Sequence, residues 1–132
     1  MSWQSFVDDR LLATKMVTHA VICGHDGSIW TRPGPFGQYR CDVLPSEVKT
    51  LLDKYDKPEE MGVCGPVIGN KMYMYLSSFE DKVVRLKAGN GGCHCFKTKQ
   101  TLILSYYEEP IVHEQAATVA EKLGEYLIGL GY

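Results

Sequence analysis

With 132 residues, 45% of them hydrophobic and 23% charged, the chain has the size and composition of one globular domain with a substantial core. Its net charge of −2 argues against a general affinity for nucleic acid, and no apolar run approaches the roughly 20 residues that a membrane span requires. The N-terminus lacks the basic and apolar regions of a secretory signal, so we expect a cytosolic protein whose five cysteines are reduced.

The first dozen residues predict a short amphipathic helix. Ser2 is a favourable N-cap, and apolar residues follow at helical spacing, at Trp3, Phe6, Val7 and Leu11. Such a stripe must be buried against another element. A tryptophan so close to a chain end, where chains commonly fray, either contacts a partner element or belongs to a binding surface.

A hairpin and a second helix are expected next. Residues 18–23 and 28–31 have the composition of two strands, joined by a turn in which Asp26-Gly27 tolerates positive φ. Residues 32–39 contain two prolines and two glycines and predict a loop. The second helix begins near Pro45 and carries one apolar face, formed by Val48, Leu51, Leu52 and Tyr55.

The rest of the chain predicts an antiparallel meander followed by a long helix. Residues 59–62 read as irregular, and short turns then separate strands expected at 63–68, 71–77, 82–88, 93–97 and 101–107. The last helix is expected from about His113 to Leu130. The order helix, hairpin, helix, meander, helix predicts an α+β domain whose terminal helices can lie side by side on one sheet face.

The cysteines and histidines do not predict a metal or catalytic site. Cys93-His94-Cys95 is dense in metal-binding side chains, but in a strand His94 points away from both cysteines, and no second ligand pair follows at metal-site spacing. The other histidines and cysteines match no nucleophile and base pattern. The glycine-rich residues 89–92 lack the lysine and hydroxyl of a phosphate loop. We therefore expect no metal, cofactor or catalytic residue.

Two patterns point to binding. Residues 71–99 carry six basic and two acidic side chains, which suggests a specific anionic partner, although solvated strand faces explain the same pattern. Aromatic residues of the terminal helices and Trp30 would converge if the two helices are neighbours. Clustered aromatic rings with polar tips often bind proline-rich peptides, whereas a small core between the helices is the alternative and, on pattern alone, the commoner arrangement.

Over essentially all 132 residues, the chain resembles the profilins, and plant and amoeboid members more than vertebrate ones. The resemblance rests on Met1-Ser2-Trp3 with Phe6-Val7-Asp8, and on the segments 20–30, 84–92, 107–110 and 121–129. It implies a single α+β domain, residues 1–132, with a central antiparallel sheet of about six to seven strands. The terminal helices would pack side by side on one face of this sheet and shorter helices on the other.

The resemblance also implies a monomeric, non-enzymatic cytoskeletal adaptor. Its implied partners are monomeric actin, proline-rich segments of actin nucleators and elongation factors, and phosphoinositide headgroups at the membrane surface. It would sequester or deliver actin monomers and influence their nucleotide exchange. The alternative is a scaffold or ligand-sensing domain of the same fold, which binds proline-rich peptides with weak or no actin binding.

Carried over to this sequence, the resemblance implies three sets of binding residues. The proline-binding positions are Trp3, Phe6, Trp30, Tyr126, Leu127 and Tyr132. The actin-binding positions are Lys71, Arg85, Lys87, Lys97, Lys99, Val112, His113, Gln115 and Glu121. The phosphoinositide-binding positions are Arg85 and Lys87.

The sequence departs from the family pattern at three places. Phe6 replaces the usual tyrosine and so lacks a hydroxyl that can bond a proline carbonyl, which is expected to weaken proline binding. Cys93-His94-Cys95 replaces a β-branched run and is expected to alter the actin-binding face. Pro33 and Pro35 add prolines beyond Trp30, where a loop could partly shade the peptide groove.

Overall fold

A computed structural model of the chain describes residues 3–17, 19–30, 45–55, 57–63, 65–68, 71–79, 82–89, 91–108 and 111–132. The helices are α1 (Trp3–Arg10), the short 3₁₀ helix η1 (Leu12–Thr14), α2 (Pro45–Asp53), α3 (Pro58–Val63) and α4 (His113–Gly129). The strands are β1 (His19–Gly24), β2 (Val67–Ile68), β3 (Lys71–Met72), β4 (Met74–Phe79), β5 (Val83–Ala88), β6 (Gly91–Lys97) and β7 (Thr101–Glu108). None of the described helices is long and apolar enough to cross a membrane.

Among the described residues, the central sheet is antiparallel and has five strands in the order β1-β7-β6-β5-β4. The expected antiparallel α+β architecture is confirmed. The described part of the central sheet has fewer strands than the six to seven expected, because β2 and β3 pair with each other in a separate two-stranded sheet. Of the return strand expected at 28–31, residue 31 lies outside the described residues, and in residues 28–30 Ile29 makes an isolated bridge with Cys23. The turn between them is as predicted, with Gly27 at a φ of 93°.

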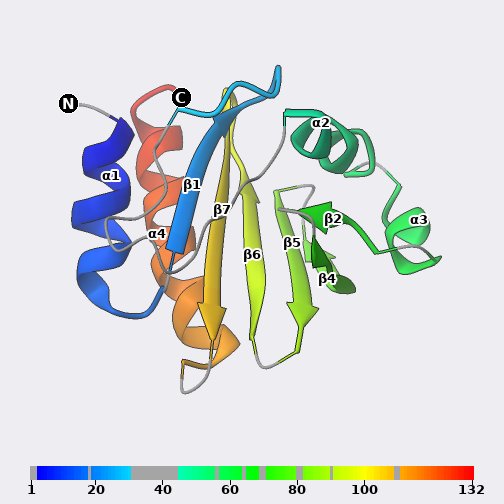
Figure 1. Ribbon diagram of the computed structural model, residues 1–132. Coiled ribbons are helices and arrows are strands. Elements are labelled where there is room, and N and C mark those ends of the chain that lie inside the picture. The colour runs from blue at the N-terminus through cyan, green and yellow to red at the C-terminus, as the bar shows by residue number, and fades with distance from the viewer. Residues whose placement is uncertain are drawn as a thin grey trace.

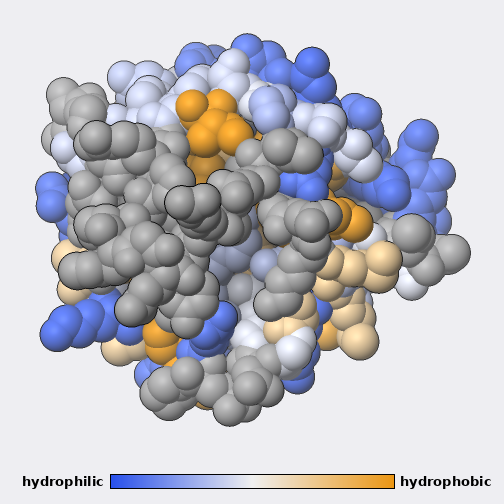
Figure 2. Space-filling model, viewed as in Figure 1, coloured by the Kyte–Doolittle hydropathy of each residue, from blue (hydrophilic) through white to orange (hydrophobic). Residues whose placement is uncertain are grey.

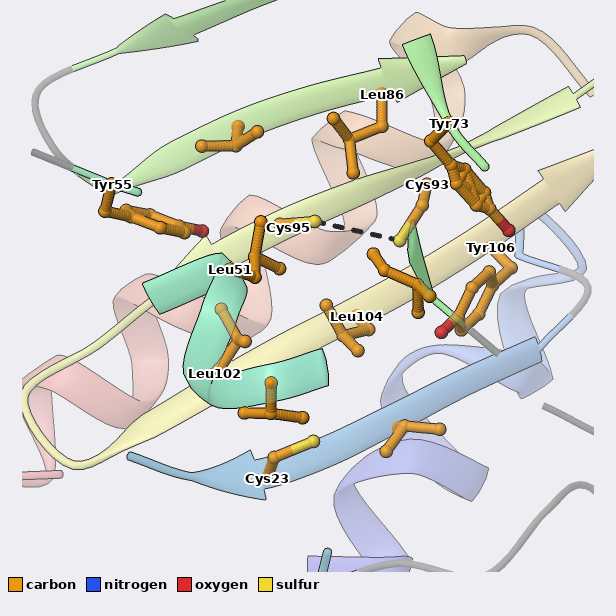
Figure 3. Packing of buried hydrophobic residues seen from close by; sticks show 14 residues of the cluster. Cys23, Leu51, Tyr55, Tyr73, Leu86, Cys93, Cys95, Leu102, Leu104 and Tyr106 are labelled. Carbon is orange, nitrogen blue, oxygen red and sulfur yellow. Dashed lines mark hydrogen bonds between the residues drawn. The ribbon is translucent and has the colours of Figure 1, made fainter. Parts of the chain in front are cut away.

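Helices cover both faces of the sheet (Figure 1). The terminal helices α1 and α4 lie side by side on one face, which confirms the expected pairing, and α2 lies over the other face. Successive side chains of each strand point to opposite faces of the sheet, so a separate hydrophobic core forms on each face. Phe96 and Ile103 pack under α1 and α4, whereas Cys95 and Leu104 pack under α2, as Figure 3 shows for the α2 side.

A glycine sets the distance between α4 and the sheet. A Cβ at Gly124 would lie 2.3 Å from the ring of Phe96, which is itself buried on β6. Only glycine therefore allows α4 to approach this ring so closely. The close approach places the last turns of α4 beside α1.

The segment before the meander was predicted wrongly. Residues 59–62 were expected to be irregular, but they belong to α3, and the strand expected at 63–68 is reduced to Val67–Ile68. Pro58 occupies the first position of α3, and Glu59 and Glu60 lie in its first turn. A proline at this position and acidic side chains at a helix N-terminus both favour a helix, although six residues are too few to show a clear apolar period.

Candidate binding surfaces

Five rings from the two terminal helices and the turn after β1 form one group, which we call the aromatic cluster: Trp3, Phe6, Trp30, Tyr126 and Tyr132. Trp3 lies at its centre, with ring centroids 4.8 Å from Trp30 and 5.1 Å from Tyr132. Phe6 lies 5.7 Å from Trp3 and 6.1 Å from Tyr126. These separations are typical of favourable aromatic pairs. The structure thus brings together the rings for which the resemblance implied proline-binding positions.

Exposure divides the predicted proline-binding residues into two layers. Trp3, Trp30 and Tyr126 are half-buried, and Tyr132 keeps 38% of its surface exposed. Phe6, at 5% exposure, and the fully buried Leu127 belong to the core beneath them. The accessible aromatic surface is therefore made by the tryptophans and tyrosines, and Phe6 and Leu127 support it from below.

Hydrogen bonds hold Tyr132 beside Trp3. The chain reverses at Gly131, whose φ is 96°, and the Tyr132 amide donates to the Leu127 carbonyl at 2.9 Å. The hydroxyl of Thr98 donates to the main-chain oxygen of Tyr132 at 3.1 Å, so the turn between β6 and β7 secures this residue. Trp3 is thus packed against partner elements and partly exposed, whereas its place in a binding surface stays a prediction.

Trp30 depends on a second glycine. Its amide donates to the Ile22 carbonyl at 2.9 Å, which fixes the backbone beside β1. A Cβ at Gly24 would lie 2.7 Å from the indole ring of Trp30, so the indole can lie against this backbone only because residue 24 is glycine. The loop with Pro33 and Pro35, expected to shade the groove, lies outside the described residues.

Arg10 borders the aromatic cluster, although the sequence analysis did not select it. Its guanidinium carbon lies 3.9 Å from the ring centroid of Tyr126, which is cation–π geometry. The signal was present in the sequence, because Arg10 follows Phe6 by four residues and therefore shares its helix face.

The basic residues of the predicted actin surface lie in different places. Arg85 and Lys87 alternate with core residues on β5 and lie on the sheet face that carries α4, since Arg85 pairs with His94, whose ring lies 5.7 Å from that of His113. Lys97 lies on the opposite face, with its ammonium 5.2 Å from the ring centroid of Tyr55. Lys99 lies exposed in the turn between β6 and β7.

The remaining actin-binding candidates lie on or near α4. Val112 directly precedes the helix and is exposed, and its amide donates to the Gln115 side chain at 3.3 Å. His113 and Glu121 are half-buried on α4 itself. The side chain of Lys71, on β3, lies outside the described part of the chain.

Exposed apolar side chains accompany Arg85 and Lys87. Met74 pairs with Lys87 and Phe79 pairs with Val83 across β4 and β5, so Met74 and Phe79 lie on the side of the sheet that carries α4. Their side chains are 65% and 62% exposed. On the face of the molecule that it presents, Figure 2 shows hydrophobic residues at the surface beside β2 and β4. Met74 and Phe79 were not among the predicted binding residues, because the edge position of β4 cannot be predicted from the sequence alone. We call Met74, Phe79, Arg85, Lys87 and Val112 the β4–β5 surface.

His94 is completely buried behind this surface, and neither of its ring nitrogens has a hydrogen-bond partner among the described residues. Burial, with the nearby His113 and Arg85, lowers the pKa of His94 to about 3. Burial and Arg85 also lower the pKa of His113, whose Nδ1 lies 3.1 Å from the Tyr107 hydroxyl. Both rings are therefore neutral at physiological pH.

Cys93 and Cys95 point to the opposite face from His94, as strand alternation predicted. Their Sγ atoms lie 3.8 Å apart under α2 (Figure 3). Within the described ranges, no group of three or more His, Cys, Asp or Glu side chains could hold a metal ion.

Comparisons with known proteins agree with this fold. The family model for profilin matches residues 1–132. A profilin from Drosophila melanogaster is 45% identical over 132 residues, covering all of both chains. The structure of profilin II from Acanthamoeba castellanii is 32% identical, with a TM-score of 0.88, over 99% of this chain and all of that one. Mouse profilin IIa, solved with a double repeat from the FH1 domain of mDia1, shares the fold at 18% identity, with a TM-score of 0.80 over all of both chains.

Proposed function

The chain belongs to the profilin family, and we propose that it is an actin-monomer-binding adaptor that carries actin to proline-rich partners through two separate surfaces on a single domain. The observation that carries this proposal is the aromatic cluster, which joins both terminal helices and leaves four rings partly open. His113 precedes Tyr126 by thirteen residues on α4, which corresponds to about 20 Å of helix. Two ligands therefore have room to bind together.

The aromatic cluster suits a polyproline II segment. Such a segment is extended before it binds, and rings held by packing and hydrogen bonds also lose little freedom, so the entropic cost of association is small. We assign the ligand contacts to Trp3, Trp30, Tyr126 and Tyr132, with Phe6 and Leu127 as the floor. The mouse profilin solved with an FH1 repeat supports a proline-rich ligand class.

Tryptophan fluorescence tests the proline site directly, because both tryptophans of the chain belong to the aromatic cluster. A proline decamer should change the emission of the wild type, and Trp3→Ala should weaken binding at least tenfold. Phe79→Ala is the matched control, since Phe79 is an exposed aromatic residue on β4 and should leave the affinity unchanged. Equal affinity of Trp3→Ala and wild type would refute the groove.

The β4–β5 surface suits an acidic protein partner such as actin. It combines exposed apolar side chains with the cationic Arg85 and Lys87, and complementary charge raises association rates and makes them salt-dependent. His113, Gln115 and Glu121 belong to α4, which lies on the same face of the sheet, and we assign them to the same partner contact. Lys97 and Lys99 lie away from it, so we assign them no central part.

A pyrene–actin assembly assay tests this surface. The double variant Arg85→Glu with Lys87→Glu should sequester actin at least tenfold less well while it binds proline decamer normally. The control, Lys49→Glu with Lys57→Glu, makes the same charge change at exposed positions in and after α2. Equal loss in both variants would show that only net charge matters. Loss of proline binding together with actin binding would contradict two separate surfaces.

We further propose that Arg85 and Lys87 bind phosphoinositide headgroups and that these lipids compete with actin. Each basic side chain near an anionic membrane contributes about 1 kcal/mol. Co-sedimentation with vesicles that contain phosphatidylinositol bisphosphate should fall in the Arg85→Glu, Lys87→Glu variant and stay unchanged in the Lys49→Glu, Lys57→Glu control. Unchanged vesicle binding in both would remove the lipid from the proposal.

An effect on actin nucleotide exchange would follow from differential affinity for an open actin cleft, without a catalytic group in this chain. Accordingly we propose a non-enzymatic protein that acts in the cytoplasm. A chain that binds proline decamer but leaves both actin assembly and nucleotide release unchanged would instead be a proline-binding scaffold.

A further inference from the structure

We propose that Arg10 makes the proline site selective for segments that carry an aspartate or glutamate just beyond the prolines. This inference rests on the proposed proline-binding function and names the partner chemistry of that site. Its basis is the position of the guanidinium, which extends the row of rings with a positive charge.

Arg10 stands at one end of the aromatic cluster. Trp3, Phe6 and Arg10 follow one another at intervals of three and four residues, so they share a face of α1. Trp30 adjoins Trp3 at the start of the helix, whereas the Arg10 guanidinium lies over Tyr126. The row therefore begins with an indole and ends with a cation about 10 Å further along the helix axis.

The contact with Tyr126 leaves the guanidinium available to a ligand. Arg10 is exposed, and in the described part of the chain its guanidinium is paired with a ring and not with a carboxylate. A guanidinium stacked on a ring keeps its N–H edges free for a carboxylate, which it can bind through two hydrogen bonds. Stacking also restricts the side chain, so less freedom is lost when a ligand binds.

Nearby charges limit the effect to direct contact. Asp9 and Glu125, which adjoin Arg10 and Tyr126 in the sequence, are both exposed. Their negative charges offset the positive charge of Arg10 for a ligand that is still some distance away. The preference for an acidic peptide therefore requires a carboxylate that contacts the guanidinium directly. An exposed pair of this kind is worth about a two- to fivefold difference in affinity.

The spacing of the site sets the position of the acidic residue. A polyproline II segment rises about 3.1 Å per residue, so the roughly 10 Å from Trp3 to Arg10 corresponds to about three residues. The carboxylate should therefore lie three or four positions from the proline that contacts Trp3, on whichever side of it approaches Arg10. A run of prolines with a terminal aspartate places the carboxylate at this position when the peptide lies along the rings in one of its two possible orientations.

The test compares four peptides by tryptophan fluorescence at low salt: eight prolines with aspartate at the N-terminal or C-terminal end, and the same two peptides with asparagine. Asparagine matches the shape of aspartate without its charge. Wild type should bind the aspartate peptide about two- to fivefold more tightly in one direction, and salt should reduce this ratio. Arg10→Gln should bind both members of each pair equally.

Two controls keep the outcomes distinct. Arg10→Glu should reverse the preference toward a peptide that ends in lysine, and circular dichroism should show an unchanged fold because Arg10 is exposed. Equal affinity of wild type for aspartate and asparagine peptides, or a preference that persists in Arg10→Gln, would overturn the role of Arg10 alone. Failure of every peptide to bind would overturn the proposed proline site and the inference with it.

Discussion

Replacement of His94 by valine should reduce the decrease in the free energy of unfolding that occurs as the pH falls. His94 is buried with both ring nitrogens lacking a hydrogen-bond partner among the described residues, and its pKa is lowered to about 3 from an ordinary value of 6.5. Between these two pH values the unfolded chain binds a proton that the folded protein does not. The stability associated with His94 is thus fully present above pH 6.5 and is lost as the pH falls toward 3.

The size of the effect follows from the interval between the two pKa values. Each pH unit within it changes the free energy of unfolding by about 1.4 kcal/mol, so the step from pH 7 to pH 4.5 removes about 2 to 3 kcal/mol in the wild type. Other groups titrate in both proteins, and their contribution cancels in the difference between wild type and His94→Val. Valine also removes the unpartnered nitrogens, so the variant should be no less stable at pH 7.

Urea unfolding at pH 7 and pH 4.5, followed by tryptophan fluorescence, measures this difference. His94→Val should lose about 2 to 3 kcal/mol less than the wild type between the two pH values. His25→Asn is the control, because it removes an exposed histidine of the turn after β1 and leaves His94 in place. If His94→Val and the wild type lose stability in parallel, the buried imidazole is not the source of the acid sensitivity.

Two glycine substitutions test the packing around the aromatic cluster. Gly124→Ala should destabilise the protein by about 1–3 kcal/mol in thermal unfolding, because the added Cβ meets the buried ring of Phe96; this outweighs the better helix propensity of alanine. Gly129→Ala is the control, since its Cβ meets no other atom, and it should be neutral or slightly stabilising in the same experiment. Equal midpoints for the two variants would argue against this packing. Gly24→Ala should displace Trp30 and weaken proline-decamer binding in a fluorescence titration while circular dichroism stays native; an unchanged affinity would show that Trp30 is not needed.

Strand alternation and helix periodicity predicted a good part of the site. They placed His94 opposite Cys93 and Cys95, and they suggested that the terminal helices and their rings meet, because both signals are local and survive in one sequence. The depth of Phe6 was not predictable in this way. Its exposure depends on how closely α4 approaches α1 and the sheet, which is a property of the packed structure.

The basic region shows why charge counts alone misplace a surface. Arg85 and Lys97 both lie in the stretch with excess positive charge, yet they lie on opposite faces of the sheet. The reason is register: Arg85 pairs with His94, so odd-numbered residues of β5 share a face with even-numbered residues of β6. The edge position of β4, which exposes Met74 and Phe79, likewise follows from strand order and not from composition.

Simultaneous occupation of the two surfaces is the central claim, and a pull-down on immobilised polyproline measures it most directly. The wild type should be retained by the resin and should hold monomeric actin there in a near-equimolar amount. Trp3→Ala should retain neither protein, whereas Arg85→Glu with Lys87→Glu should stay on the resin without actin. Release of the wild type from the resin by added actin would contradict the claim, because it would show that the two ligands compete for one site.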